Sequence, residues 1–111
     1  MDITSEKFDN YDLVKMKGRI DSNTAPQLRE AFSAITDDNR FRIVFDMGGV
    51  DYISSSGVWV LLDTQKTCKK RNRGELRVAN VNENIEYTLD LAGLKHFIQI
   101  FESVEAAEDG W

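Results

Sequence analysis

Cysteine, histidine and long apolar runs are nearly absent from the sequence. The single cysteine, Cys68, cannot form an internal disulfide bond, and its place on a predicted apolar helix stripe indicates an inert, buried thiol in a reducing cytosol. The single histidine, His96, has no second histidine or paired cysteine with which to bind zinc, so we expect a surface or half-buried residue and no metal site. The longest apolar run, residues 58–62, is too short for a membrane span or a signal peptide. We therefore expect a cytoplasmic protein without membrane insertion.

Basic residues are also the minority, with 14 Lys and Arg against 19 Asp and Glu and a net charge of -5. An acidic surface repels phosphate backbones and anionic headgroups, so nucleic acid and membrane surfaces are not expected partners. The one basic cluster, residues 69–73, lies at a predicted helix carboxyl end, where cations complement the helix dipole; a phosphate-binding patch is the alternative interpretation. With 111 residues, of which 41% are hydrophobic, we expect one domain over residues 1–111 with a single modest core.

The order of predicted elements indicates an α/β fold. Short apolar runs predict strands over residues 3–8, 11–17, 41–47, 75–79 and 97–101, and helical spacing predicts helices over residues 24–35, 55–71 and 82–91, with a short one from 103. Asp9 and Asn10 predict a hairpin between the first two strands, and Gly48 and Gly49 are expected to end the third. From residue 11 onward strands alternate with helices. This alternation predicts a mixed, mainly parallel sheet of four to five strands with helices packed on it.

Several residues have the types that begin or end helices. Thr24 followed by Gln27 has the form of a capping box, with Pro26 in the first turn. Residues 72–74 are expected to stop the second helix, and Asn82 to cap the third. Gly93 is expected to end the third helix. These residues predict where the three helices begin and end.

Three consecutive serines, Ser54, Ser55 and Ser56, precede Gly57 at the point where a buried strand is followed by a helix. One serine suffices to cap a helix, so we expect the other two hydroxyls to lie exposed in the first turn, in the positive end of the helix field. A phosphate could be held there by unpaired amides, and the missing side chain of Gly57 would let a second backbone or a nucleotide approach. On these residues alone, a simple cap and a binding site both remain open.

Four segments in order, residues 18–25, 43–47, 51–58 and 90–94, resemble successive signatures of the STAS domain. The likeness is strongest to bacterial anti-sigma factor antagonists and covers nearly the whole chain. The resemblance implies a regulatory protein that is not an enzyme and needs no cofactor. It would bind an anti-sigma factor of the serine-kinase type while unphosphorylated, be released on serine phosphorylation, and be reset by a serine phosphatase.

The resemblance also implies roles for individual residues. The family's acceptor serine matches Ser56, with Ser55 as the alternative, and the Gly-Leu pair that follows it matches Gly57 and Val58. Asp21 matches a family aspartate on the neighbouring loop, beside the acceptor and the partner contact. Val58 replaces the usual leucine, which makes the expected apolar contact with the partner smaller.

Ser54 and Trp59 complete the expected partner-binding surface. Ser54 stands where the family often has aspartate, so a carboxylate beside the acceptor is missing. Trp59 falls on the polar stripe of the predicted helix with Asp63 and Lys66, one turn from the serines. It is either an interface anchor or a ring that covers lysine stems or a neighbouring loop, and the sequence leaves both open.

The sequence also leaves two alternative functions to consider, a serine hydrolase and a STAS adaptor subunit. A serine hydrolase needs glycine two residues before and after its nucleophile; around Ser55 the first position is Ile53, and only His96 could act as base. No Walker-type or dinucleotide-binding glycine pattern occurs either. The nearer rival is a STAS adaptor subunit of a transporter or signalling complex that is not phosphorylated. Ser54 in place of aspartate and an exposed Trp59 favour it.

Overall fold

The computed structural model describes residues 2–70 and 73–111, and in these ranges five strands form one sheet in the order β1-β2-β3-β4-β5. The elements along the chain are β1 (Asp2–Lys7), β2 (Asp12–Ile20), α1 (Ala25–Asp37), β3 (Arg42–Ile53), α2 (Ser55–Lys69), β4 (Glu75–Ala79), α3 (Glu83–Leu91), the 3-10 turn η2 (Leu94–His96), β5 (Ile100–Phe101) and α4 (Val104–Glu108). β1 pairs with β2 in an antiparallel hairpin, and the other neighbouring strands are parallel. The predicted mixed, mainly parallel α/β fold is confirmed.

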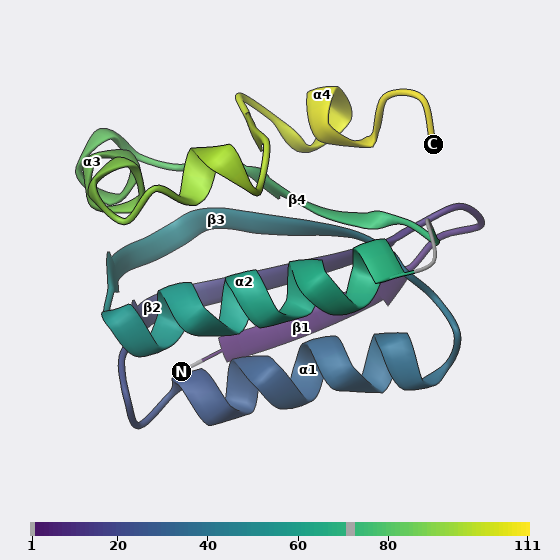
Figure 1. Ribbon diagram of the computed structural model, residues 1–111, viewed down its shortest axis with the longest axis horizontal. Coiled ribbons are helices and arrows are strands. Elements are labelled where there is room, and N and C mark those ends of the chain that lie inside the picture. The colour runs from purple at the N-terminus through teal and green to yellow at the C-terminus, as the bar shows by residue number, and fades with distance from the viewer. Residues whose placement is uncertain (1, 71–72) are drawn as a thin grey trace.

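Helices α1 and α2 lie side by side along one face of the sheet, and both begin at the same end of it (Figure 1). The strands alternate as a half-buried pleat requires: Ile43 and Phe45 of β3 face these helices, whereas Val44 faces away, toward α4. On α1, Leu28, Phe32 and Ile35 form the predicted apolar stripe and are buried. The rings of Phe32 and Phe45 meet edge to face with centroids 5.4 Å apart, which ties α1 to the centre of the sheet.

Strand β3 is longer than predicted. It continues through Gly48 and Gly49 to Ile53, and its register against β2 shifts twice, so the strand contains bulges. A Cβ on Gly49 would lie 2.7 Å from Cγ of Lys17, which explains why glycine occupies a strand at this point. Gly49 therefore allows a close approach of β2 and β3, and the two glycines do not end the strand. The extra residues carry β3 up to the serine loop.

The predicted helix boundaries had mixed outcomes. Asn82 caps α3 by accepting a hydrogen bond from the Ile85 amide at 2.9 Å, and Gly93 follows the helix with a φ of 74°, as expected. The capping box at Thr24 is wrong, because the Thr24 side chain makes no capping hydrogen bond in α1. Helix α2 ends at Lys69; the predicted end at Arg71 and stop at Asn72 lie outside the described residues.

The last predicted strand is shorter than expected. Only Ile100 and Phe101 pair with β4, and the residues before them follow the 3-10 turn η2. The predicted closing helix is confirmed as α4, capped by Ser103, whose hydroxyl accepts from the Ala106 amide at 3.1 Å. Ala107 of α4 packs on the face of the sheet opposite α1 and α2.

Candidate functional site

Two loops lie next to each other at the end of the sheet where α1 and α2 begin (Figure 1). The parallel register places Ile20, the last residue of β2, beside Ile53, the last residue of β3. The loop of residues 21–24 and the serine loop of residues 54–56 therefore start side by side. The Ser54 amide donates to the Ile20 carbonyl at 2.8 Å and joins the two loops directly. The structure thus brings Asp21 and the serines together, as the sequence implied.

Asp21 organises the first loop. Its Oδ1 accepts hydrogen bonds from the amides of Asn23 at 2.9 Å and Thr24 at 3.1 Å, and its Oδ2 lies 3.8 Å from the Arg19 guanidinium. The Asn23 amide makes the largest contribution to lowering the pKa of the Asp21 carboxyl, with Thr24 and Arg19 adding to it. The Thr24 hydroxyl accepts from the Asp21 amide and donates to the Arg19 carbonyl at 2.8 Å. Thr24 therefore braces this loop instead of capping α1, which corrects the predicted capping box.

The three serines have different positions. Ser54 is the N-cap of α2 in an extended conformation, and its hydroxyl accepts from the Gly57 amide at 3.4 Å. Ser55 is exposed in the first turn, whereas Ser56 is half-buried. The expected cap by one serine and the exposure of Ser55 are confirmed, whereas Ser56 is less exposed than expected. Ser55 and Ser56 are left as the hydroxyls that could be modified.

Ser56 opens on a hollow of about 500 Å³ between α1 and α2. Trp59 also lines it from α2, and Ser22, Pro26 and Arg29 line it from the first loop and α1. The hollow is open to solvent. No histidine is among the residues that line it, and the serine consequently has no imidazole base there.

Gly57 and Val58 do not face this hollow. Gly57 is buried, and a Cβ on it would meet Cγ2 of Ile20 at 2.5 Å and Cγ1 of Ile53 at 2.7 Å. Val58 is only 7% exposed and belongs to the main core. The start of α2 turns both residues toward the sheet, and their expected contact with a partner stays a prediction. Gly57 lets the start of α2 approach the ends of β2 and β3.

Two exposed aromatic rings lie near the loops. Trp59 is 62% exposed, which agrees with its predicted place on the polar stripe. Tyr52, at the end of β3, is 41% exposed, and the Arg19 guanidinium lies 4.1 Å from its ring centroid. Sequence reasoning missed the Tyr52 and Arg19 pair. The register that places these two residues opposite each other depends on the bulges of β3, which have no simple pattern in the sequence.

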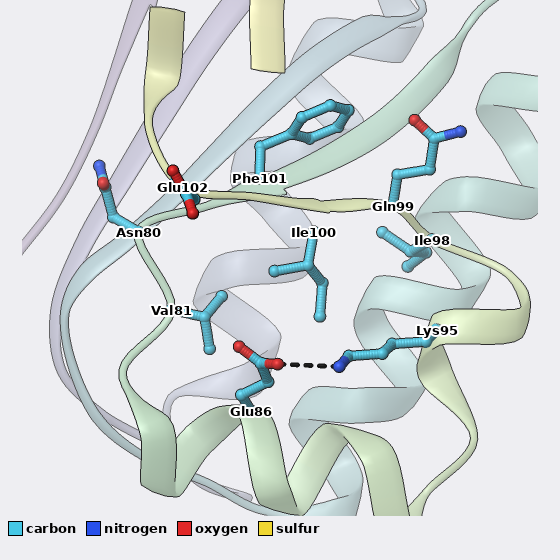
Figure 2. A pocket seen from close by; sticks show the side chains of 9 residues that line it. All are labelled: Asn80, Val81, Glu86, Lys95, Ile98, Gln99, Ile100, Phe101 and Glu102. Carbon is cyan, nitrogen blue, oxygen red and sulfur yellow. Dashed lines mark hydrogen bonds and ion pairs between the residues drawn. The ribbon is translucent and has the colours of Figure 1, made fainter. Parts of the chain in front are cut away.

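A second hollow, of about 590 Å³, lies where β4 and β5 end (Figure 2). Lys95 points across it to Glu86, with Nζ 2.8 Å from Oε2, and Asp90 lies 3.3 Å from the same nitrogen. The two carboxylates raise the pKa of Lys95, with Glu86 the larger cause. No serine, cysteine or histidine lines this hollow, and its lysine is already paired. It therefore offers no activated nucleophile.

The other candidate groups are accounted for by their surroundings. Cys68 is buried, and burial raises the pKa of its thiol to about 12, which fits the predicted inert role. His96 is exposed in η2. Within residues 2–70 and 73–111, no group of three or more His, Cys, Asp or Glu is placed to hold a metal ion. None of the helices that the structure describes is both long enough and apolar enough to cross a membrane.

Comparison with known proteins identifies the family. The STAS domain model matches residues 2–107. BtrV of Bordetella bronchiseptica, named as a candidate anti-sigma factor antagonist, is 30% identical over 107 residues, which are 96% of this chain and 91% of BtrV.

Solved structures agree with this family. The crystal structure of an anti-sigma factor antagonist from Mycobacterium paratuberculosis has a TM-score of 0.86 at 24% identity and covers 96% of this chain and 89% of its own. The Bacillus cell fate determinant SpoIIAA in its phosphorylated form has a TM-score of 0.73 at 18% identity and covers 97% of both chains. These likenesses show the fold. The chain belongs to the STAS domain family.

Proposed function

We propose that this protein is an anti-sigma factor antagonist that works by switching partners. In the unphosphorylated state it binds an anti-sigma factor that is itself a serine kinase, and the sigma factor is freed. Phosphorylation of Ser56 then releases the anti-sigma factor. The observation that carries the proposal is the position of Ser56 in the first turn of α2, half-buried but open to a solvent-filled hollow beside the exposed Trp59.

The chemical step requires little from this chain. The Ser56 Oγ attacks the γ-phosphorus of an ATP held by the kinase; the new O–P bond forms as the bond to ADP breaks, and a base of the kinase takes the hydroxyl proton. The substrate must therefore present an accessible oxygen, which the open hollow allows. Bacillus SpoIIAA, which shares the fold, exists in a phosphorylated form, so the fold accommodates such a group.

A phosphoryl group would change the partner surface more than the domain. It adds about -1.5 to -2 charges and three acceptor oxygens. The start of a helix favours negative charge, so α2 itself tolerates the modification. A partner packed against Ser56 and Trp59 would have to desolvate the added charge without pairing it, which opposes binding. Release then needs no large refolding.

Ser54 is compatible with this switch although the family often has aspartate there. Serine and aspartate are both good N-cap residues, and Ser54 makes the capping hydrogen bond to the Gly57 amide. The substitution keeps the local geometry of the first turn. It removes one negative charge beside Ser56, which leaves the unphosphorylated surface less acidic for its partner.

The proposed docking surface consists of the loop of Asp21, the exposed serine face and Trp59. Asp21 holds the loop in one conformation through its hydrogen bonds to Asn23 and Thr24, so the surface is formed before the partner arrives. Trp59 supplies the large exposed ring that often anchors an interface. The proposed cycle takes place in the cytosol, where ATP and sigma factors occur, and a serine phosphatase would reset it.

Phosphate mapping tests the proposal. The protein is mixed with its cognate kinase-type anti-sigma factor and ATP, and the phosphorylated peptide is sequenced by mass spectrometry. We expect the phosphoryl group on Ser56, loss of labelling in Ser56→Ala, and normal labelling in the matched control Ser55→Ala. Labelling of Ser56→Ala at the wild-type rate would place the acceptor elsewhere.

A STAS adaptor subunit that is not phosphorylated is the second candidate. The missing carboxylate at position 54 favours it, because nothing then distinguishes this serine loop from an ordinary capped helix start. A pull-down from the source cytosol separates the two functions. Recovery of a serine kinase with the unmodified protein supports the switch, whereas recovery of a transporter ATPase supports the adaptor.

A further inference from the structure

Arg29 of α1 lies between two hollows along the seam of α1 and α2. It lines the hollow that contains Ser56 and Trp59, and it also lines a smaller one, of about 50 Å³, that contains Asp63 and Thr67. Arg29 thus borders both hollows. Arg29 lies outside the four STAS-like segments and outside the predicted helix caps.

In the unphosphorylated protein Arg29 is paired with Asp63. Its Nη2 lies 3.1 Å from Oδ2 of Asp63, and the two side chains are 51% and 47% exposed. Exposed pairs of this kind contribute little to stability, because solvent screens them and holding both side chains costs conformational entropy. Arg29 can therefore exchange Asp63 for a stronger anion with little loss.

Helix geometry places such an anion within the same seam. Ser56 and Asp63 are seven residues apart on α2, so they lie on one face of the helix, about two turns from each other. Arg29 lines the same hollow as Ser56 and Trp59 while its Nη2 pairs with Asp63. Among the described residues that line the Ser56 hollow, Arg29 is the only cation, and Glu30 is the other charged group. A phosphoryl group on Ser56 would repel Glu30 and attract Arg29.

We infer that Arg29 binds the phosphoryl group of Ser56 and leaves Asp63 when Ser56 is phosphorylated. This inference rests on the proposed phosphorylation of that serine. A dianionic phosphate accepts the two parallel hydrogen bonds of a guanidinium and forms a stronger pair than a single carboxylate oxygen does. The exchange leaves the Asp63 carboxylate without its cation. The charge then changes at position 56, before Trp59 on α2, and at position 63, after it. Arg29 therefore extends the change from one residue to two turns of the partner surface.

Phosphorus NMR of the intact chain tests this directly. Phosphoserine is incorporated at position 56 during translation, and its second pKa is titrated in the otherwise wild-type chain, in Arg29→Gln and in Lys66→Gln. Removing a paired cation disfavours the dianion, so we expect Arg29→Gln to raise that pKa by about half a unit or more. Lys66→Gln removes the same charge from an exposed position of α2, and we expect it to leave the second pKa of the phosphoserine unchanged.

A conservative variant supplies a second comparison. The inference is overturned if Arg29→Gln and wild type give the same phosphate pKa, or if Arg29→Lys, which keeps the charge but not the fork, retains the full effect of arginine.

These outcomes are independent of the proposed function. The phosphoserine is placed without a kinase, so a failed kinase assay on Ser56 would contradict the switch and leave the titration intact. Labelled Ser56 with an unchanged titration would instead contradict only the role of Arg29. Melting curves of each variant check that the exposed substitutions leave the fold in place.

Discussion

Gly57 packs directly against Ile20, so closely that a Cβ on the glycine would lie 2.5 Å from the Cγ2 methyl of the isoleucine. Ile20 is fully buried at the end of β2, and its β-branched side chain has little freedom to move. The contact sets the distance between the start of α2 and the sheet. It therefore also fixes where Ser55 and Ser56 stand above the neighbouring loop.

Gly57→Ala is expected to destabilise the protein although alanine favours helices. The higher helix propensity contributes about 1 kcal/mol, whereas overpacking a well-packed core costs about 1–3 kcal/mol. We expect the free energy of unfolding in urea to fall by up to about 2 kcal/mol, the difference between these two terms. Ser55→Ala, on the exposed side of the same turn, is the control and should stay within about 0.5 kcal/mol of wild type. A Gly57→Ala protein more stable than wild type would contradict the close packing.

Gln65 is a buried polar residue of α2 whose side chain forms hydrogen bonds with backbone groups of other segments. Its Oε1 accepts from the Leu76 amide at 2.6 Å, and its Nε2 donates to the carbonyls of Leu76 at 3.1 Å and Phe97 at 2.9 Å. Gln65 thus connects α2 to the start of β4 and to the segment that precedes β5. A side chain of similar size without polar atoms would leave three backbone groups unpaired.

Gln65→Met is therefore expected to lower the free energy of unfolding by about 3 kcal/mol or more, since three backbone groups lose a partner and each such buried group costs about 1–3 kcal/mol. Thermal and urea denaturation measure the loss. Lys66→Met, the exposed neighbour on the same helix, is the control and should change stability by less than about 0.5 kcal/mol. Equal stabilities of the two variants would contradict the role assigned to Gln65.

Local sequence signals predicted the elements whose causes are local. The hairpin at Asp9 and Asn10, the cap at Asn82 and the positive φ of Gly93 depend on a few neighbouring residues, and the structure has all three. The capping box at Thr24 failed because the Thr24 hydroxyl bonds the Asp21 amide and the Arg19 carbonyl, and the Gln27 amide donates to the Thr24 backbone carbonyl instead. A cap pattern in the sequence does not show that a preceding loop already uses the threonine hydroxyl.

Tertiary contacts account for the remaining differences. Gly48 and Gly49 were expected to end β3, but the strand continues because its pairing with β2 resumes beyond them through bulges, and Gly49 leaves room there for Lys17 of β2. Gly57 and Val58 were assigned to a partner surface because of their place in the serine segment, whereas the rotation of α2 against Ile20 turns both inward. These outcomes depend on packing between elements far apart in the sequence.

The charge of Asp21 is expected to stabilise the fold in a defined pH range. The folded-state pKa of its carboxyl is lowered below the unfolded value of about 3.9, first by the hydrogen bond from the Asn23 amide. The stabilisation is therefore present in full above about pH 4 and is lost as the pH falls through the folded-state pKa.

Urea denaturation of wild type and Asp21→Asn between pH 7 and pH 2.5 measures this contribution. Asparagine keeps the acceptor oxygen but not the charge, so we expect wild type to be more stable at pH 7 and the difference to shrink below about pH 4. Asp9→Asn, in the exposed hairpin turn, is the control and should show little difference at any pH. A difference between wild type and Asp21→Asn that persists unchanged to pH 2.5 would contradict the lowered pKa.

Trp59→Ala separates binding from stability. The ring is 62% exposed, so its removal should leave the melting temperature nearly unchanged. As a proposed interface anchor it should weaken binding of the anti-sigma factor by about 30-fold, the effect of losing about 2 kcal/mol at an interface hot spot. Tyr87→Ala, another exposed aromatic residue but on α3, is the control and should bind as wild type does. Unchanged binding of Trp59→Ala would support the alternative in which the ring only covers neighbouring side chains.

The central claim is that one phosphoryl group on Ser56 turns docking off. Isothermal titration of the kinase-type anti-sigma factor into the unmodified protein and into the protein carrying phosphoserine at 56 tests it most directly. Burying an added charge without a partner is costly, so we expect the unmodified protein to bind and the phosphoserine protein to lose affinity by about 100-fold or more. Equal affinity of the two forms would contradict the account.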